Sequence, residues 1–266
     1  MTGAAAAAGQ PEPRIEVDGA TASAGQLRAA ALAGYGHFTA MQVRDRRVRG
    51  LDLHLARLDG ANREVFGAGL DAARVLDHIR HALGDDTRDA SVRVYVRELR
   101  DRPSVMVTVR PPGVMPGAPW KLRSVPYQRS LAHIKHLGDF GQSYFRRLAV
   151  RSGYDEALLT GPGGVISEGS ITNIGFADGV GIIWPAAPAL QGITMQLLNL
   201  RLADYGLRPR SVPVRLSDVG SFAAVFVTNA RGIAPAGQID EQAVPVDPAL
   251  MATLLRAYDS AGWDPI

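Results

Sequence analysis

A stretch dense in proline and glycine, PPGVMPGAP at residues 111–119, constrains the fold of this chain more than any other feature. Its four prolines and two glycines cannot continue a helix or a central strand, because proline lacks a backbone N–H donor and both residues interrupt regular structure. We therefore expect an interdomain linker at this point. It separates a first domain at residues 15–110 from a second at residues 120–266, and residues 1–14 are expected to form a disordered tail.

Helix and strand patterns alternate on both sides of the linker. Before it, hydrophobic periodicity predicts strands at 15–19, 37–43, 91–99 and 104–110, with a turn at 100–103, and helices at 51–66 and 72–83. After it, the pattern predicts helices at 142–152, 194–205 and 248–261, strands at 154–160, 181–185 and 223–229, and two short strands within 165–179. The fold class is therefore α/β (α+β), with two domains.

Composition excludes several classes of protein. No apolar run approaches the ~20 residues that a membrane span needs, and the N-terminus has no basic start typical of a secretory signal. The chain has no cysteine, so it has no disulfide and no thiolate metal site, and we expect a cytoplasmic protein without a metal. A net charge of +3 and a pI of 9.4 suggest a polyanion. The basic residues alternate with acids along the chain, however, so a nucleic-acid partner ranks last.

The basic residues themselves carry a sharper signal. Of 29 lysines and arginines, 27 are arginines, and the only lysines are Lys121 and Lys135. Arginine stays protonated, whereas a desolvated lysine can lose its proton and become a nucleophilic amine. Both lysines are therefore candidates, although both are also explained as chance survivors of an arginine-rich composition. We prefer that explanation for Lys121, which lies in the strand-like stretch WKLRSV.

Small polar residues cluster at the ends of apolar strands in the second domain. They occur in SEGSITN at residues 167–173, in VTN at residues 227–229, and in QGIT at residues 191–194, which opens a helix. A helix start with nearby hydroxyls suits a phosphate, although any one of these motifs is equally an ordinary helix cap or turn. Glu168 lies in an otherwise uncharged stretch. If its carboxylate is buried, we expect it to pair with a cation, such as a protonated heteroaromatic nitrogen; if it faces solvent, it is an ordinary strand residue.

The combined order of lysine, carboxylate, helix start and Thr-Asn strand end resembles the fold-type IV pyridoxal-phosphate enzymes. That family includes branched-chain and D-amino-acid aminotransferases and 4-amino-4-deoxychorismate lyase. The resemblance runs from about Phe38 to Ile239 and is strongest in HIKHLGDFGQS, GYDEALLTGPGGVISEGSITNIGF and LQGIT, with HLARL in the first domain. It implies a small N-terminal α/β domain, a larger C-terminal α/β barrel-like domain, a pyridoxal 5'-phosphate cofactor, and a homodimer.

The resemblance also implies roles for individual residues. Lys135 matches the Schiff-base lysine, which also moves protons as a general base and acid, and Glu168 matches the carboxylate that bonds the pyridine nitrogen. The matched phosphate ligands are Arg57, Ile193 and Thr194, and Thr228 and Asn229 lie in a segment that supplies further phosphate contacts in the family.

The sequence departs from the family pattern in two places. The family commonly reads GITR, whereas this chain has Met195 after Thr194, which removes a charge near the phosphate end. The acidic-glycine pattern before the first long strand is replaced by AGYGHFTAM, so we expect Tyr35 either to line the substrate pocket or to be a loop aromatic. Arg97, in VYVREL, is expected either to bind a substrate carboxylate or to lie on a solvated strand face.

The leading functional hypothesis is an aminotransferase that moves an amino group between a small amine or amino acid and a 2-oxo acid. KHLGDFGQS is similar to the branched-chain enzymes, whereas IKH and VTNA resemble the deoxychorismate lyase group, whose members eliminate pyruvate with the same lysine. A binding protein that keeps the fold without activity is a third hypothesis, disfavoured because both Lys135 and Glu168 are present. The substrate and its handedness stay open.

Overall fold

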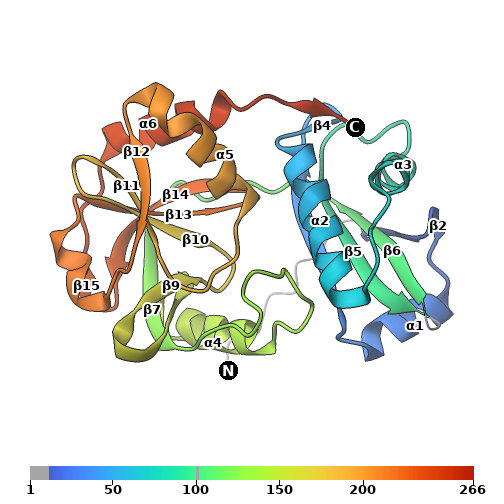
Figure 1. Cartoon of the computed structure of the whole chain (residues 1–266), viewed down its shortest axis with the longest axis horizontal. Helices are drawn as coiled ribbons and strands as arrows, with labels where there is room; N and C mark the ends of the chain where they lie inside the picture. The colour runs from blue at the N-terminus through green and yellow to red at the C-terminus, as the bar shows by residue number, and fades with distance from the viewer. Residues whose placement is uncertain (1–11, 100–101) are drawn as a thin grey trace. The chain divides into compact units, whose positions relative to one another are not determined.

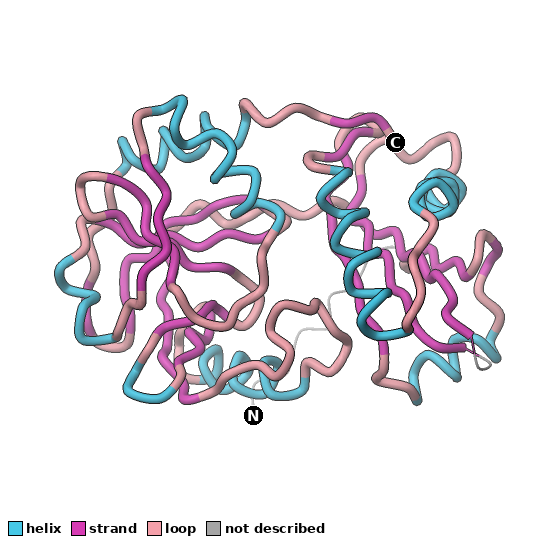
Figure 2. Tube along the Cα trace, in the orientation of Figure 1, coloured by secondary structure: helices cyan, strands magenta, loops and turns pink. Residues whose placement is uncertain are grey.

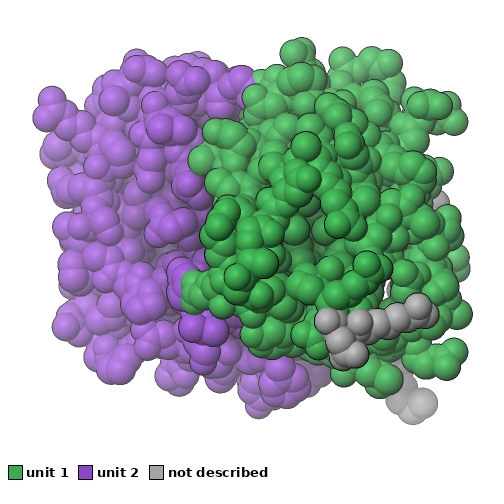
Figure 3. Space-filling model, turned by 45° about the vertical axis from the view of Figure 1, so that its right-hand side comes forward, with its two compact units in different colours: residues 1–113, 263–266 green, residues 114–262 purple. Residues whose placement is uncertain are grey.

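A computed structural model describes residues 12–99 and 102–266, and the chain divides into two compact units (Figure 3). Unit 1 comprises residues 1–113 with residues 263–266, and unit 2 comprises residues 114–262. The boundary between them lies within the proline-rich stretch that was predicted as a linker. Residues 1–11 of the predicted tail and residues 100–101 of the predicted turn lie outside the described residues.

Unit 1 is built on a five-stranded antiparallel sheet with the strand order β2-β1-β6-β5-β3. Its strands are β1 (Arg14–Val17), β2 (Ala20–Thr21), β3 (Gly36–Val43), β5 (Ala90–Leu99) and β6 (Arg102–Arg110). Its helices are α1 (Ala24–Leu32), α2 (Leu51–Phe66) and α3 (Ala72–Leu83). Buried side chains of α2 and α3, among them Leu58 and Ile79, pack with Val92 and Val94 of β5, and α2 is seen beside the sheet in Figure 1. The periodic apolar positions of residues 51–66 and 72–83 therefore form the helices that were predicted there.

The last four residues of the chain belong to unit 1 and not to the second domain, where the sequence analysis placed them. Two short strands, β4 (Arg47–Val48) and β16 (Asp264–Pro265), pair antiparallel. The Asp264 carboxylate also accepts a hydrogen bond from the backbone N–H of Leu51 at 2.9 Å, which satisfies a donor in the first turn of α2. Contacts between residues more than 200 positions apart thus correct the boundary.

Unit 2 contains a nine-stranded mixed sheet. The strands are β7 (Trp120–Pro126), β8 (Glu156–Thr160), β9 (Ile166–Gly169), β10 (Asn173–Ala177), β11 (Gly181–Pro185), β12 (Arg208–Val212), β13 (Ala224–Asn229), β14 (Gly232–Ile239) and β15 (Gln242–Ala243). Their order is β12-β11-β10-β13-β14-β7-β8-β9, with β15 paired to β14. The two ends of the sheet approach each other, because Ile166 of β9 donates to the carbonyl of Val214, just after β12, at 2.8 Å. The sheet is therefore curled, as Figure 2 shows, and the expected barrel-like fold is confirmed.

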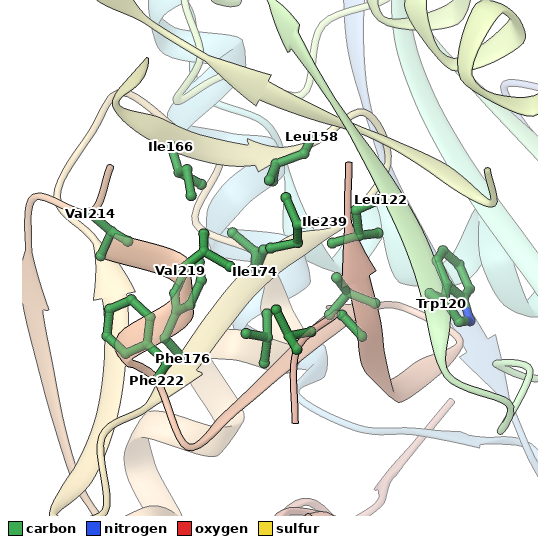
Figure 4. Packing of buried hydrophobic residues seen from close by; sticks show 14 of the residues in the cluster. Trp120, Leu122, Leu158, Ile166, Ile174, Phe176, Val214, Val219, Phe222 and Ile239 are labelled. Atoms are coloured by element: carbon green, nitrogen blue, oxygen red, sulfur yellow. The ribbon is translucent and has the colours of Figure 1, made fainter. Parts of the chain in front are cut away.

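Helices and apolar clusters fill unit 2 inside and outside the curled sheet. The helices are α4 (Phe140–Arg151), α5 (Ile193–Arg201) and α6 (Pro248–Asp259), with short 3-10 turns η1 (Pro162–Gly164), η2 (Leu202–Tyr205) and η3 (Leu216–Ser221). One cluster, which includes Leu158, Ile174 and Phe176, lies within the curl (Figure 4). A second cluster joins Phe226 of β13 to α5 and α6. Apolar residues on both faces explain why residues 223–227 form a continuous apolar run instead of an alternating one.

None of the helices in the described part of the chain is both long and apolar enough to span a bilayer.

Candidate active site

Lys135 lies in the loop between β7 and α4, and its side chain is half-buried. The loop does not rely on regular structure to hold its shape. The guanidinium of Arg129 donates to the carbonyl oxygens of Ala132 at 3.0 Å and of Ile134 at 2.7 Å. The peptide that leads directly into Lys135 is therefore fixed by a buried side chain.

Glu168 lies near the end of β9 and is buried. One carboxylate oxygen accepts from Arg129 Nη1 at 2.9 Å, and the other accepts from the backbone N–H of Leu190 at 3.1 Å. Burial raises the pKa of Glu168, while the charge and hydrogen bond of Arg129, the Leu190 N–H and the charge of Lys135 act to lower it. The charges of Lys135 and Arg129 thus both act on the Glu168 carboxylate, and its partnership with a cofactor nitrogen stays a prediction.

The loop before α5 is bonded on both sides to the segment that carries Glu168. The Leu190 N–H goes to Glu168, and the Leu190 carbonyl accepts from the Asn173 side chain at 2.7 Å. Gly192, the residue before α5, lies so close to Asn173 that an added Cβ would be 2.0 Å from its side-chain oxygen. A Cβ would displace the Asn173 side chain from its bond to the Leu190 carbonyl, so glycine lets the residue before α5 pack directly on Asn173.

The N-terminus of α5 has free donors and a nearby hydroxyl. The residue before the helix, Gly192, provides no side-chain cap, so the first N–H groups, including those of Ile193 and Thr194, have no partner within the helix. The Thr194 hydroxyl donates to the carbonyl of Asn229 at 2.8 Å, and the Asn229 side chain accepts from the N–H of Arg231. The hydroxyl of Thr228 is buried and has no hydrogen-bond partner among the described residues. Orphaned donors around one helix start fit a phosphate.

Met195, which replaces the family's arginine, is half-buried. It packs against the cluster that joins α5 and α6 to β13. The absence of the family's arginine at this position therefore leaves an apolar contact and places no charge beside Thr194.

Arg57 lies on α2 of unit 1, where its guanidinium donates to the hydroxyl of Thr39. His54 Nδ1 is bonded to the same hydroxyl at 2.7 Å. Burial lowers the pKa of Arg57 to about 10, with no carboxylate offsetting it within the described chain, and Arg57 Nε is buried without a partner. A half-buried guanidinium with an unused Nε donor is suited to an anionic group.

Arg97 and Tyr35 both bond to backbone carbonyls within unit 1. Arg97 of β5 donates to the carbonyl of Ala30 in α1, and burial lowers the pKa of Arg97. Tyr35 is 61% exposed, and its hydroxyl donates to the carbonyl of Val65 at 3.0 Å. Both contacts hold helices of unit 1 to neighbouring segments, so a substrate-binding role for either residue stays a prediction.

The predicted site residues are thus divided between the two units. Unit 1 holds Arg57, Arg97 and Tyr35. Unit 2 holds the other six, Lys135, Glu168, Ile193, Thr194, Thr228 and Asn229. Arg129 bonds Glu168 to the peptide before Lys135, Leu190 bonds Glu168 to the loop before α5, and Thr194 bonds to Asn229.

Sequence reasoning missed Arg129, and it named Asn173 only as one of the clustered polar residues, without its contact to the Leu190 carbonyl. Arg129 was one of 27 arginines, and nothing local distinguishes the buried one from the exposed ones. Asn173 lies in the recognised SEGSITN segment, but its contact is with a loop 17 residues away. The useful signal would have been the buried Glu168 itself, because a buried carboxylate requires a cationic partner nearby.

A second buried carboxylate, Glu156 at the start of β8, gives a pH-dependent prediction. One of its oxygens accepts from the Ser170 hydroxyl and the Ala157 N–H, and the other is buried without a partner among the described residues. Burial raises the pKa of Glu156. A raised pKa in the folded state means that its stabilising contribution is complete below the ordinary glutamate pKa, about 4.3, and is lost as pH rises through the raised value.

We therefore expect Glu156→Gln, which cannot ionise, to gain stability relative to the parent protein as pH rises. The gain at alkaline pH should be roughly 1 to 3 kcal/mol, the cost of a buried group without its partner. Urea unfolding at a series of pH values measures it. Glu241→Gln, at an exposed position, is the matched control and should show no such trend. A constant difference between Glu156→Gln and the parent across the series would contradict the assignment.

The chain was compared with known protein families, curated sequences and solved structures. The family model described as amino-transferase class IV matches residues 36–239, which is more than half of the chain. No sequence among the curated proteins matches the chain.

Solved structures share the fold. A hypothetical aminotransferase from Mycobacterium tuberculosis in its PLP-bound form has a TM-score of 0.76 at 20% identity, with 87% of this chain and 90% of that chain covered. A fold IV-transaminase from Curtobacterium pusillum has a TM-score of 0.75 at 21% identity, with 87% of this chain and 88% of that chain covered. A Legionella pneumophila protein described as a putative 4-amino-4-deoxychorismate lyase has a TM-score of 0.77 at 18% identity, with 88% of this chain and 94% of that chain covered. At such identities these likenesses establish the fold alone.

Proposed function

The chain belongs to the class IV aminotransferase family, and from this premise we propose that it is a pyridoxal-phosphate-dependent aminotransferase acting between a small amine or amino acid and a 2-oxo acid. The observation that carries the proposal is the buried Glu168 carboxylate, which lies in the field of Lys135 and is bonded through Leu190 to the loop before α5. This arrangement offers a nucleophilic amine, an anion for a cationic ring and a phosphate-binding helix start within one unit.

Pyridoxal 5'-phosphate is the cofactor that family membership and the PLP-bound relative support, in agreement with the expectation from sequence. When bound, it supplies an electron sink that stabilises negative charge on the carbon beside the amino group. The ε-amine of Lys135, when deprotonated, would hold it covalently, and once free the same amine would take up and return the proton at the reacting carbon. Glu168 would provide the negative charge that keeps the ring nitrogen protonated, because a buried carboxylate is stabilised by a cation.

The phosphate is assigned to groups that have unused donors in the structure. These are the N–H groups of Ile193 and Thr194 at the start of α5 and the orphaned hydroxyl of Thr228. The resemblance of HLARL to the family leads us to propose Arg57 as the charged ligand, and its half-buried guanidinium has no carboxylate partner among the described residues. Asn229 contributes by holding the Thr194 hydroxyl, since its own side chain is bonded to Arg231.

We expect Thr228→Val to weaken pyridoxal-phosphate binding by about tenfold or more, because one hydrogen bond to a charged group is lost. The measurement is a titration of the apoprotein followed by the cofactor's visible absorbance. Pyridoxal, which lacks the phosphate, is the matched ligand and should bind the variant and the parent equally. Equal weakening for both ligands would contradict the assignment of Thr228 to the phosphate.

The proposed reaction is tested in two separate half-reactions. Addition of an amine donor should remove the visible band of the bound cofactor, and later addition of a 2-oxo acid should restore it. A panel of amines and amino acids of both hands, read optically, then gives the substrate class. If no donor in the panel removes the band, the aminotransferase assignment is wrong.

A lyase is the second candidate function. The residues IKH and VTNA, together with the structural likeness to the Legionella pneumophila protein, favour it. Release of pyruvate from 4-amino-4-deoxychorismate without any added acceptor would identify the lyase, whereas an aminotransferase needs the acceptor to turn over.

A homodimer and a cytoplasmic location also stay predictions, and light scattering of the purified protein tests whether it is a homodimer.

A further inference from the structure

Arg129 lies in the loop between β7 and α4, six residues before Lys135, and is the buried arginine of the described chain. Its side chain is 4% exposed, and that of its partner Glu168 is 6% exposed. Nη1 donates to Glu168 Oε1 at 2.9 Å and to the Ala132 carbonyl at 3.0 Å, and Nη2 donates to the Ile134 carbonyl at 2.7 Å. One guanidinium therefore bonds both to a carboxylate 39 residues away and to the peptide directly before Lys135.

These contacts use a property of arginine that lysine lacks. The guanidinium is a rigid planar fork with several N–H donors, so it can bond to acceptors on two sides at fixed angles. A buried charge is costly unless it is paired and bonded, and here the two carbonyls and the carboxylate together provide that compensation. The groups whose charges or hydrogen bonds act on Glu168 are Arg129, Lys135 and the Leu190 N–H, and the first two are the cations among them.

We propose that Arg129 is a positioning residue for the cofactor site. Its guanidinium holds the Glu168 carboxylate and the backbone before Lys135 at fixed positions relative to each other. The inference deepens the proposed function and rests on it. Arg129 acts through other groups in two ways: it keeps Glu168 negatively charged, as a partner of the ring nitrogen would need to be, and it fixes the Lys135 peptide relative to that carboxylate. Glu168 in turn is bonded to the N–H of Leu190, in the loop that leads to the start of α5, where the phosphate is assigned.

Three variants separate the two actions. Arg129→Met removes the charge and all donors while keeping an unbranched side chain of similar length. Arg129→Lys keeps the charge but, as a single ammonium, cannot reproduce the planar fork. Arg129→Met combined with Glu168→Gln removes both charges, which buried pairs commonly tolerate. Arg123→Met is the matched control, because Arg123 is exposed and its guanidinium lies over the Tyr154 ring.

The first measurement needs no cofactor. Infrared spectra of the full-length apoprotein, with 13C-labelled glutamate, report protonated glutamate carboxyl groups. We expect Arg129→Met to show an additional protonated signal at neutral pH that is absent from the Met/Gln double variant, which assigns it to Glu168 and not to the buried Glu156. Arg129→Lys and Arg123→Met should not show it. Absence of the additional signal from Arg129→Met would overturn the first action.

The second measurement is the dissociation constant of pyridoxal phosphate. We expect Arg129→Met to raise it about 10- to 100-fold, as the loss of a supporting contact behind a ligand does elsewhere, and Arg129→Lys to raise it less. Addition of Arg129→Met to Glu168→Gln should weaken binding further, because the Ile134 contact is lost as well. Equal affinity of Glu168→Gln and the double variant would overturn the second action, even if Arg129→Met alone does not fold.

The two proposals fail in different ways. If the parent protein binds no pyridoxal phosphate, the proposed function is wrong, but the infrared comparison still decides whether Arg129 keeps Glu168 ionised. If the parent binds the cofactor and the Arg129 variants bind it equally well with no new carboxyl signal, the proposed function stands and the role of Arg129 is wrong.

Discussion

Lys135→Ala should lose the visible absorbance of the bound cofactor and lower the rate of amino-group transfer by about 10⁴-fold or more, because one amine provides both the covalent attachment and the proton transfer. Lys135→Arg should be equally inactive, since a guanidinium stays protonated and is no nucleophile. Both variants are expected to fold, because Lys135 is half-buried in a loop whose backbone is held by Arg129. Absorbance spectra and single-turnover rates measure the effect.

The composition of the chain provides an unusually direct control. Lys121 is the only other lysine, and it is exposed on β7. Lys121→Ala should therefore keep both the absorbance and the activity. Reduction of the holoprotein with borohydride, followed by peptide mass spectrometry, should find the cofactor on the peptide that contains residue 135. A visible band that persists in Lys135→Ala, or a label on Lys121, would refute the assignment.

Glu168→Gln is expected to have the second largest effect, on both activity and stability. The rate should fall by about 10²- to 10³-fold, as it does when a preorganised electrostatic partner is removed from a site. The free energy of unfolding should fall by about 3 kcal/mol, because the variant leaves the Arg129 guanidinium buried without its anion. Single-turnover kinetics and urea unfolding measure the two effects separately.

A variant that keeps the negative charge distinguishes the electrostatic role of Glu168 from a general loss of packing. Glu168→Asp keeps the negative charge with a shorter side chain, so it should retain more activity than Glu168→Gln. An exposed substitution, Glu241→Gln, should change neither property. If Glu168→Gln is as stable and as active as the parent, neither the ion pair with Arg129 nor the partnership with the ring nitrogen describes Glu168.

Much of the architecture followed from local patterns. The helices at 51–66 and 72–83 were predicted with their observed ends, because apolar residues recur at helical spacing on the face that packs on the sheet. The helix predicted at 194–205 is in fact α5 to Arg201 followed by the 3-10 turn η2, since the tighter turn continues the same pattern. The helix predicted from residue 142 begins at Phe140, two residues earlier.

By itself, the sequence determined the mixed α/β elements, the family and its cofactor, and the candidates Lys135 and Glu168, because periodicity, turn residues and motif order are encoded locally. Tertiary structure alone decided which buried polar groups meet. It paired Arg129 with Glu168, bonded Asn173 to the Leu190 carbonyl, and joined residues 263–266 to unit 1. The physical reason is that a pattern shows which side of an element is buried, whereas the partner of a buried charge is chosen by chain segments that folding brings together from distant positions.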